Sequence, residues 1–178
     1  MDVLVAVTGA SNYYRSAEFF LHSKECNPRH DHAYDRSVEC FRAAAFYTTP
    51  RIEPVQIPYE GTTLPGYLYR ADDSGTPRPT VIMHNGFDGT AEEMHFFGAP
   101  AAIERGYTVL VFDGPGMPGP RHHQGLVFRP DWENVITPVI DFAETIPEVD
   151  NSRIALLGLS RGGVLAPGRP RSSTGWPR

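Results

Sequence analysis

The sequence has few basic residues and almost no lysine. Its 178 residues include 16 lysines and arginines against 21 aspartates and glutamates, for a net charge of −5, and Lys24 is the single lysine. A nucleic-acid binder, or a protein that docks on anionic membranes, needs an excess of positive charge. We therefore expect neither a nucleic-acid partner nor a membrane partner.

Cysteine is also scarce, and long apolar runs are missing. Cys26 and Cys40 make neither a disulfide framework nor a metal-ligand pattern, so we expect two reduced structural thiols and no bound metal. No run is long enough to span a bilayer, and Asp2 stands where a signal peptide carries positive charge. These absences predict a soluble, cytoplasmic protein.

The first 50 residues are expected to be helical. Apolar side chains recur every three to four positions in SNYYRSAEFFLHS and in DHAYDRSVECFRAAAFY, with charges between them. Two short amphipathic helices cannot bury both stripes completely against each other. We interpret residues 1–50 as an N-terminal helical segment that packs on the later part of the chain, and that serves as part of a cap or as the contact surface of a homo-oligomer.

Strand patterns begin after Pro50. VQIPYE and LPGYLYR flank the turn EGTT and predict a β-hairpin, while TVIMH, YTVLVFD and RIALLGLS are apolar runs typical of buried parallel strands. One helix is predicted from a Thr-x-x-Glu capping box at residue 90, with Pro100 kinking or splitting it, and another over DWENVITPVIDFAETI, capped by Asp131. GPGMPGPRHHQG is expected to be a loop. This alternation predicts an α/β fold with a parallel sheet over residues 51–165.

The segment GLSRG places Ser160 in the pattern Gly-x-Ser-x-Gly. A Gly/Ser turn that ends a strand has the same composition, so the pattern alone is weak. Its context favours catalysis, because a buried strand precedes it and a helix follows, an arrangement that lifts a serine oxygen above the edge of a sheet. Gly158 and Gly162 are needed where side chains would collide with tightly turned backbone. We interpret Ser160 as a nucleophile.

A serine nucleophile needs hydrogen-bond donors for the oxyanion that forms when it attacks a carbonyl. The backbone N–H of Arg161, directly after the serine, is one candidate. The other is the N–H of Phe87 in the loop HNGFDG, where Asn85 and Gly86 let the backbone turn toward the site. A plain turn is the alternative interpretation of this loop.

The chain resembles the α/β-hydrolases in four segments: the strand–HNGFDGT–helix unit, YTVLVFDGPG, DWENVITPVIDF and RIALLGLSRGG. The resemblance covers residues 10–165 and is to the branch with a helical segment before the core, which includes 2,6-dihydroxypseudooxynicotine hydrolase, fungal polyketide-shortening hydrolases and proteins labelled dipeptidyl aminopeptidase or acylaminoacyl-peptidase. It implies a partial α/β-hydrolase fold: N-terminal helices, a hairpin, then parallel strand–helix units ending at the nucleophile elbow. It also implies a small-molecule carbonyl substrate, cleaved at an ester, an amide or a carbon–carbon bond beside a ketone, without a cofactor.

The triad of the resembled family runs serine, then aspartate or glutamate, then histidine. After Ser160 this sequence has no aspartate, glutamate or histidine, so the base that would take the serine proton is missing from its expected position. We interpret His84 as orienting its loop. Three further histidines are interpreted as surface or lid residues: His95, His122 and His123.

Residues 166–178 are predicted to be an unstructured tail. GRPRSSTGWPR is rich in the residues that a GC-rich gene yields when read out of frame, and the arginine bias of the whole chain supports GC-rich coding. The strand RIALL is apolar on both faces, and no later strand pattern covers its outer edge. We therefore expect a frameshift or premature stop near residues 166–168, with a genuine disordered basic tail as the alternative.

The sequence leaves two functions open. The first is a serine hydrolase that the missing triad residues impair. The second is a non-catalytic, truncated hydrolase-like protein that acts as a remnant or a binding partner. A nucleotide-binding domain is a weak third interpretation, because GPGMPG follows a strand but prolines interrupt the Gly-x-Gly-x-x-Gly pattern.

Overall fold

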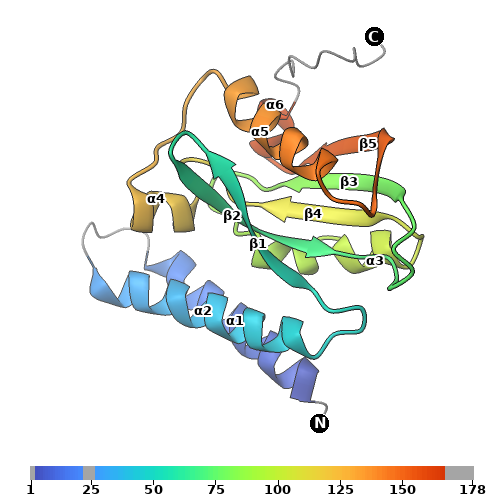
Figure 1. The fold of residues 1–178 in the computed structure, drawn as a ribbon. Coiled ribbons are helices and arrows are strands. Elements are labelled where there is room, and N and C mark those ends of the chain that lie inside the picture. The colour runs from blue at the N-terminus through green and yellow to red at the C-terminus, as the bar shows by residue number, and fades with distance from the viewer. Residues whose placement is uncertain (1–2, 22–26, 167–178) are drawn as a thin grey trace. The chain divides into compact units, whose positions relative to one another are not determined.

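A computed structural model describes residues 3–21 and 27–166 of the chain (Figure 1). The chain divides into two compact units, residues 1–54 and 55–178. Cys26 and nearly all of the predicted tail lie outside the described residues.

Two helices, α1 (Val3–Phe20) and α2 (Pro28–Phe46), make up most of the first unit. Asn27 caps α2, because its side-chain oxygen accepts the N–H of Arg29 at 3.2 Å. Pro28 then occupies the first turn, where a missing N–H costs nothing. Helices are thus present in the first 50 residues, as the sequence predicts.

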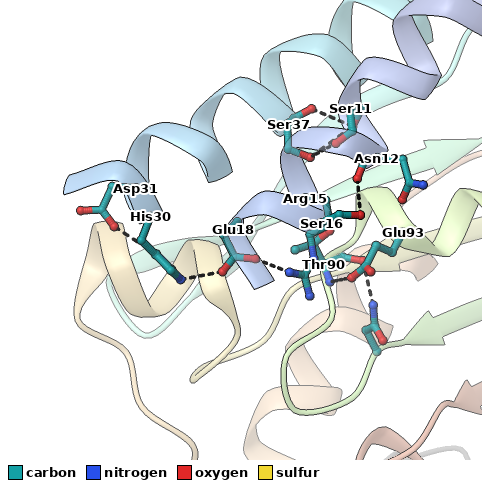
Figure 2. A network of polar contacts seen from close by, with 11 residues as sticks. Ser11, Asn12, Arg15, Ser16, Glu18, His30, Asp31, Ser37, Thr90 and Glu93 are labelled. Atoms are coloured by element: carbon teal, nitrogen blue, oxygen red, sulfur yellow. Dashed lines mark hydrogen bonds and ion pairs between the residues drawn. The ribbon is translucent and has the colours of Figure 1, made fainter. Parts of the chain in front are cut away.

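A buried polar network joins these two helices (Figure 2). Ser11 Oγ donates to the carbonyl oxygen of Ser37 at 2.8 Å, and Ser37 Oγ donates to that of Ser11 at 2.9 Å. Farther along α1, the Glu18 carboxylate accepts a hydrogen bond from Arg15 and lies 2.7 Å from His30 Nε2 on α2. Pairing offsets the cost of burying these polar groups. The network therefore favours one register of α1 on α2.

The second unit is built on a five-stranded mixed sheet. Its strands are β1 (Glu53–Tyr59), β2 (Thr62–Tyr69), β3 (Arg78–His84), β4 (Thr108–Phe112) and β5 (Val149–Gly158). Their order is β1-β2-β4-β3-β5, with β2 antiparallel to β4 and with β3 parallel to both β4 and β5. The predicted hairpin strands and the three apolar strands are confirmed, and the parallel part of the sheet has the α/β arrangement that the sequence predicts.

Among the described residues of this unit there are five helical segments, of which the last follows β5: η1 (Glu92–His95), α3 (Ala99–Ile103), α4 (Pro118–Gln124), α5 (Glu133–Glu144) and α6 (Gly162–Leu165). The helix predicted from residue 90 is split, because Gly98 has a φ of +122° and Pro100 lies in the first turn of α3. One half of its capping box forms, since the N–H of Thr90 donates to Glu93 Oε2 at 2.9 Å (Figure 2).

Two local predictions are wrong. Part of the expected Gly/Pro loop forms α4, which begins with Pro118 and is followed by the C-cap residue Gly125 in the left-handed conformation, with a φ of +68°. Asp131 does not cap α5, because the N-cap position is Trp132 and no side chain bonds the free N–H groups there. The Asp131 carboxylate instead pairs with Arg129 at 2.7 Å.

The main core lies between the sheet and α5. Strand side chains meet one face of that helix in a single buried cluster that includes Ile57, Leu64, Ile82, Leu110, Phe112, Trp132, Val135, Ile136 and Val139. Figure 1 shows α5 and α3 on opposite sides of the sheet. β5 lies at the sheet edge, and within the described residues β3 is its only partner strand. Leu156 is partly buried against the core while Leu157 stays 40% exposed, so the structure buries only part of one face of β5, whereas its apolar run predicts burial of both.

Candidate active site

Ser160 lies in a tight turn between the end of β5 and the start of α6. Its φ of +54° is in the left-handed region, which costs a non-glycine residue about 1 kcal/mol or more. Backbone hydrogen bonds hold the turn on both sides: Leu159 N–H donates to the His84 carbonyl oxygen at 3.0 Å, and Gly163 N–H donates to that of Ser160 at 3.0 Å. The turn exposes the serine side chain to solvent.

The two glycines of the motif make this turn sterically feasible. A Cβ on Gly158 would lie 2.6 Å from the backbone nitrogen of Gly163 and would overlap the Gly162 carbonyl. A Cβ on Gly162 would lie 2.6 Å from His84 Nδ1 and 2.7 Å from the His84 carbonyl oxygen. Real Cβ atoms do not approach backbone this closely, because the contacts are far inside van der Waals separation. Strand, turn and helix can therefore fold back on β3 only with glycine at both positions.

The loop after β3 lies directly against Ser160. A Cβ on Gly86 would be 3.0 Å from the Cβ of Ser160 and 3.3 Å from its Oγ. Phe87, the predicted source of one oxyanion donor, follows Gly86 in this loop, and Arg161, the other, follows Ser160. The structure thus brings the three predicted site residues to one place at the end of the parallel strands.

Asn85 holds the loop over residues 85–90 in shape. Its Nδ2 donates to the carbonyl oxygen of Thr90 at 2.8 Å, and its Oδ1 accepts the N–H of Gly86 at 2.7 Å. The amide also fills the space where a side chain on Gly89 would lie. Because Asn85 is only 6% exposed, these bonds are shielded from water and link the two ends of the loop.

An aromatic stack borders the site. The rings of Phe87 and Phe128 are stacked with centroids 5.4 Å apart, and Phe128 also lies 5.9 Å from the ring of Trp132. The guanidinium carbon of Arg161 lies 4.5 Å from the Phe128 centroid and 5.2 Å from that of Phe87. Phe128 and Trp132 are site residues that the sequence reasoning missed. Only the proximity of two aromatic residues to a predicted helix start could have indicated them.

His84 lies beneath the turn and is fully buried. Its imidazole packs edge-to-face on Phe112 and on Trp132, with centroid separations of 4.9 and 5.1 Å. Burial lowers the pKa of the His84 imidazole to about 4, because a charged ring would lose its hydration. The ring is therefore neutral at pH 7, and its place under the elbow is that of a packing residue.

Within residues 3–21 and 27–166, no histidine hydrogen-bonds to Ser160 Oγ. His95 stacks on Tyr69 with centroids 6.1 Å apart, and burial lowers its pKa as well. His122 and His123 lie on α4 and are exposed.

A family model described as esterase FrsA-like matches residues 5–168 of the chain. Hydrolase acrC of Aspergillus aculeatus is 41% identical over 185 residues, which cover 91% of this chain and 43% of that protein. The 20-hydroxy-prefusarin hydrolase FUS2 of Gibberella moniliformis is 39% identical over 165 residues, which cover 88% of this chain and 39% of that protein. The chain thus spans about two fifths of the length of these curated relatives.

A solved structure of similar fold is that of 2,6-dihydroxy-pseudo-oxynicotine hydrolase, with a TM-score of 0.71 and 22% identity. The similarity covers 92% of this chain and 52% of that one. At this level of identity the likeness shows the fold alone, which is a partial α/β-hydrolase fold. Among the described helices, none combines the length and apolar character that crossing a bilayer requires.

Proposed function

The chain belongs to the FrsA-like esterase family of α/β hydrolases, and on that premise we propose that Ser160 is the nucleophile of a serine hydrolase site. The observation that carries the proposal is the exposed serine in left-handed conformation, with Gly86 of the neighbouring loop close to its Oγ. Strain at a non-glycine residue persists only where the surrounding structure enforces it, and it gathers at functional sites.

The proposed first step is attack of Ser160 Oγ on a carbonyl carbon of the substrate. The carbonyl oxygen becomes an oxyanion and accepts hydrogen bonds from the backbone N–H groups of Phe87 and Arg161. The closeness of Gly86 to Ser160 supports this pairing, because it places the start of the oxyanion loop at the nucleophile. A reacting carbonyl would then lie between the two loops.

Removal of the serine proton is the weak step in a polypeptide of this sequence. No histidine hydrogen-bonds to Ser160 Oγ within residues 3–21 and 27–166, and the buried His84 imidazole, with a pKa of about 4, is a poor base at pH 7. We infer that Ser160 reacts slowly in this polypeptide, since oxyanion binding alone still supplies about 10³–10⁴ over water. The second candidate is a non-catalytic hydrolase-like protein that acts by binding, and the lack of a histidine bonded to Ser160 among the described residues favours it.

The proposed substrate is a small molecule with a reactive carbonyl: an ester, an amide or a ketone beside the carbon–carbon bond that is cleaved. The name of the relative from Gibberella moniliformis, a hydrolase of 20-hydroxy-prefusarin, supports a small-molecule substrate. We also propose that the protein works in the cytoplasm and uses no cofactor.

Covalent labelling with a fluorophosphonate tests the role of Ser160. We expect the 178-residue chain to gain one adduct by intact-mass spectrometry, and peptide mapping to place it on Ser160. Ser160→Ala should abolish the adduct, because the reacting oxygen is gone. Ser152→Ala is the matched control: this exposed serine lies earlier on β5, and its loss should leave labelling unchanged. Absence of any adduct in the wild-type chain would favour the non-catalytic alternative.

A further inference from the structure

The guanidinium of Arg161 rests on an aromatic surface beside the nucleophile. The platform consists of Phe87, Phe128 and Arg161, with the guanidinium carbon within 5.2 Å of both ring centroids. Cation–π contact of this kind fixes the orientation of a side chain that would otherwise sample many rotamers. Phe87 remains 47% exposed, so the platform faces solvent at the site.

The two ring contacts involve the charge of the guanidinium and are not hydrogen bonds to oxygen, so they leave its N–H donors unused in such bonds. The five N–H donors of an arginine lie in the guanidinium plane and point outward from its edge. Within the described residues, no carboxylate or carbonyl oxygen accepts a hydrogen bond from the Arg161 side chain. Arg153, earlier on β5, is different, because its Nε lies 2.6 Å from the Asp150 carboxylate. Arg161 is thus held in place and keeps its donors available.

The platform lies beside the proposed nucleophile, Ser160. Arg161 follows Ser160 directly, and Phe87 follows Gly86, whose Cβ position would be 3.3 Å from Ser160 Oγ. A substrate carbonyl at Ser160 would therefore have its neighbouring atoms next to the guanidinium and the exposed face of Phe87.

We propose that Phe87, Phe128 and Arg161 form a subsite for a carboxylate carried on a planar, unsaturated or aromatic part of the substrate. Arginine matches a carboxylate with two parallel hydrogen bonds, which a neutral amide cannot reproduce. The exposed ring of Phe87 contacts the planar body. The inference rests on the proposed function only in naming the ligand a substrate, because the subsite can be measured without any reaction.

Benzoate is the probe, and its binding to the full 178-residue chain is measured by NMR titration. We expect saturable binding to the wild-type chain and about tenfold weaker binding to Arg161→Gln, which removes the charge and keeps the backbone N–H. Arg161→Lys keeps the charge without the planar fork and should fall between the two. Benzamide should bind weakly and equally to all three.

Arg105→Gln is the matched control, because Arg105 is exposed and its side chain donates only to the carbonyl oxygen of Ala101 among the described residues. It should bind benzoate as the wild type does. Benzoate binding that is undetectable in the wild type, or equal in wild type and Arg161→Gln, would overturn the subsite. Far-ultraviolet circular dichroism of each variant confirms that it is folded.

Ser160→Ala separates this proposal from the catalytic one. We expect it to bind benzoate as the wild type does, and we expect benzoate to slow fluorophosphonate labelling of the wild-type chain. Labelling that benzoate does not slow would overturn the placement of the subsite and leave the nucleophile standing. Benzoate binding that depends on Arg161 in a chain that takes no label would overturn the nucleophile and leave the subsite standing.

Discussion

Gly162, at the start of α6, has no room for a side chain because the end of β3 lies against it. Its missing Cβ would lie 2.6 Å from the imidazole Nδ1 of His84 and 2.7 Å from the carbonyl oxygen of that residue. We expect Gly162→Ala to lower the free energy of unfolding by about 3 kcal/mol, because the backbone atoms it meets cannot move aside as a flexible side chain would. Urea denaturation at pH 7 measures the loss.

Gly163→Ala is the control for that substitution. The nearest atom to its added Cβ is the Gly158 carbonyl oxygen at 3.3 Å, so a small adjustment accommodates it. We expect a change within about 1 kcal/mol. Equal losses at the two glycines would show that close packing on β3 is not what requires glycine in the motif.

The lowered pKa of His84 makes stability depend on pH. The folded chain holds this imidazole neutral down to a pKa of about 4, whereas an unfolded histidine titrates near 6.5. Between these values the unfolded state binds more protons, so the stability contribution is complete above pH 6.5 and is lost as the pH falls toward 4. From pH 7 to pH 5 we expect the free energy of unfolding to fall by about 2 kcal/mol more in the wild type than in His84→Leu.

Urea denaturation of both chains at the two pH values measures this difference. Other groups, His95 among them, titrate in both proteins and cancel in the comparison. Parallel pH profiles for wild type and His84→Leu would contradict the assignment of a buried neutral imidazole.

Among the elements, the loop over residues 85–90 depends on one side chain for its shape. Asn85→Ala removes the bonds to Thr90 and to Gly86 and leaves the buried N–H of Gly86 without its partner, while the Thr90 carbonyl oxygen keeps only the N–H of Glu93 at 3.1 Å. We expect a loss of about 2 kcal/mol in stability, together with slower fluorophosphonate labelling of Ser160, because the donor at Phe87 is no longer held. Urea denaturation and the time course of labelling measure the two effects.

Asn151→Ala provides the comparison for the loop. Asn151 is exposed, and its Nδ2 donates to the Glu144 carbonyl oxygen at 3.3 Å on the surface of the unit. We expect a stability change within about 0.5 kcal/mol and unchanged labelling. If Asn85→Ala labelled as fast as Asn151→Ala, the loop conformation would not matter for reactivity.

The elements also differ in how well their sequences predict them. β3 and β4 are recognisable in the sequence because a short run of apolar residues between turn signals is typical of a buried parallel strand. α4 was not, because glycine and proline usually mark loops, yet Pro118 and Gly125 sit at the two helix ends where these residues are favourable. The split at Gly98 was partly foreseeable from Pro100, since proline cannot donate within a helix.

For the whole molecule, self-association through the N-terminal helices stays a prediction. Tyr13 and Phe20 lie seven residues apart on one face of α1, and each is 82% exposed. A second copy of the chain would remove this apolar surface from water. We expect sedimentation velocity to detect a dimer that the double variant Tyr13→Glu, Phe20→Glu converts to monomer. Ala43→Glu, at an exposed position on α2, should leave the dimer intact. A wild-type monomer at every concentration would contradict the prediction.

The amino-acid sequence was sufficient to predict the order of the five strands, the family, and the turn that holds Ser160. These depend on local chemistry: apolar runs, glycines at fixed spacing and a serine between them. The tertiary structure decided what surrounds that serine. Residues far apart in the chain, such as Gly86, Phe128 and Arg161, meet only because β3 and β5 are parallel neighbours and their connecting segments return to one end of the sheet. The tertiary structure also decided that the His84 imidazole is buried and neutral. A histidine before a loop has the same local sequence whether it faces solvent or packs on a buried tryptophan.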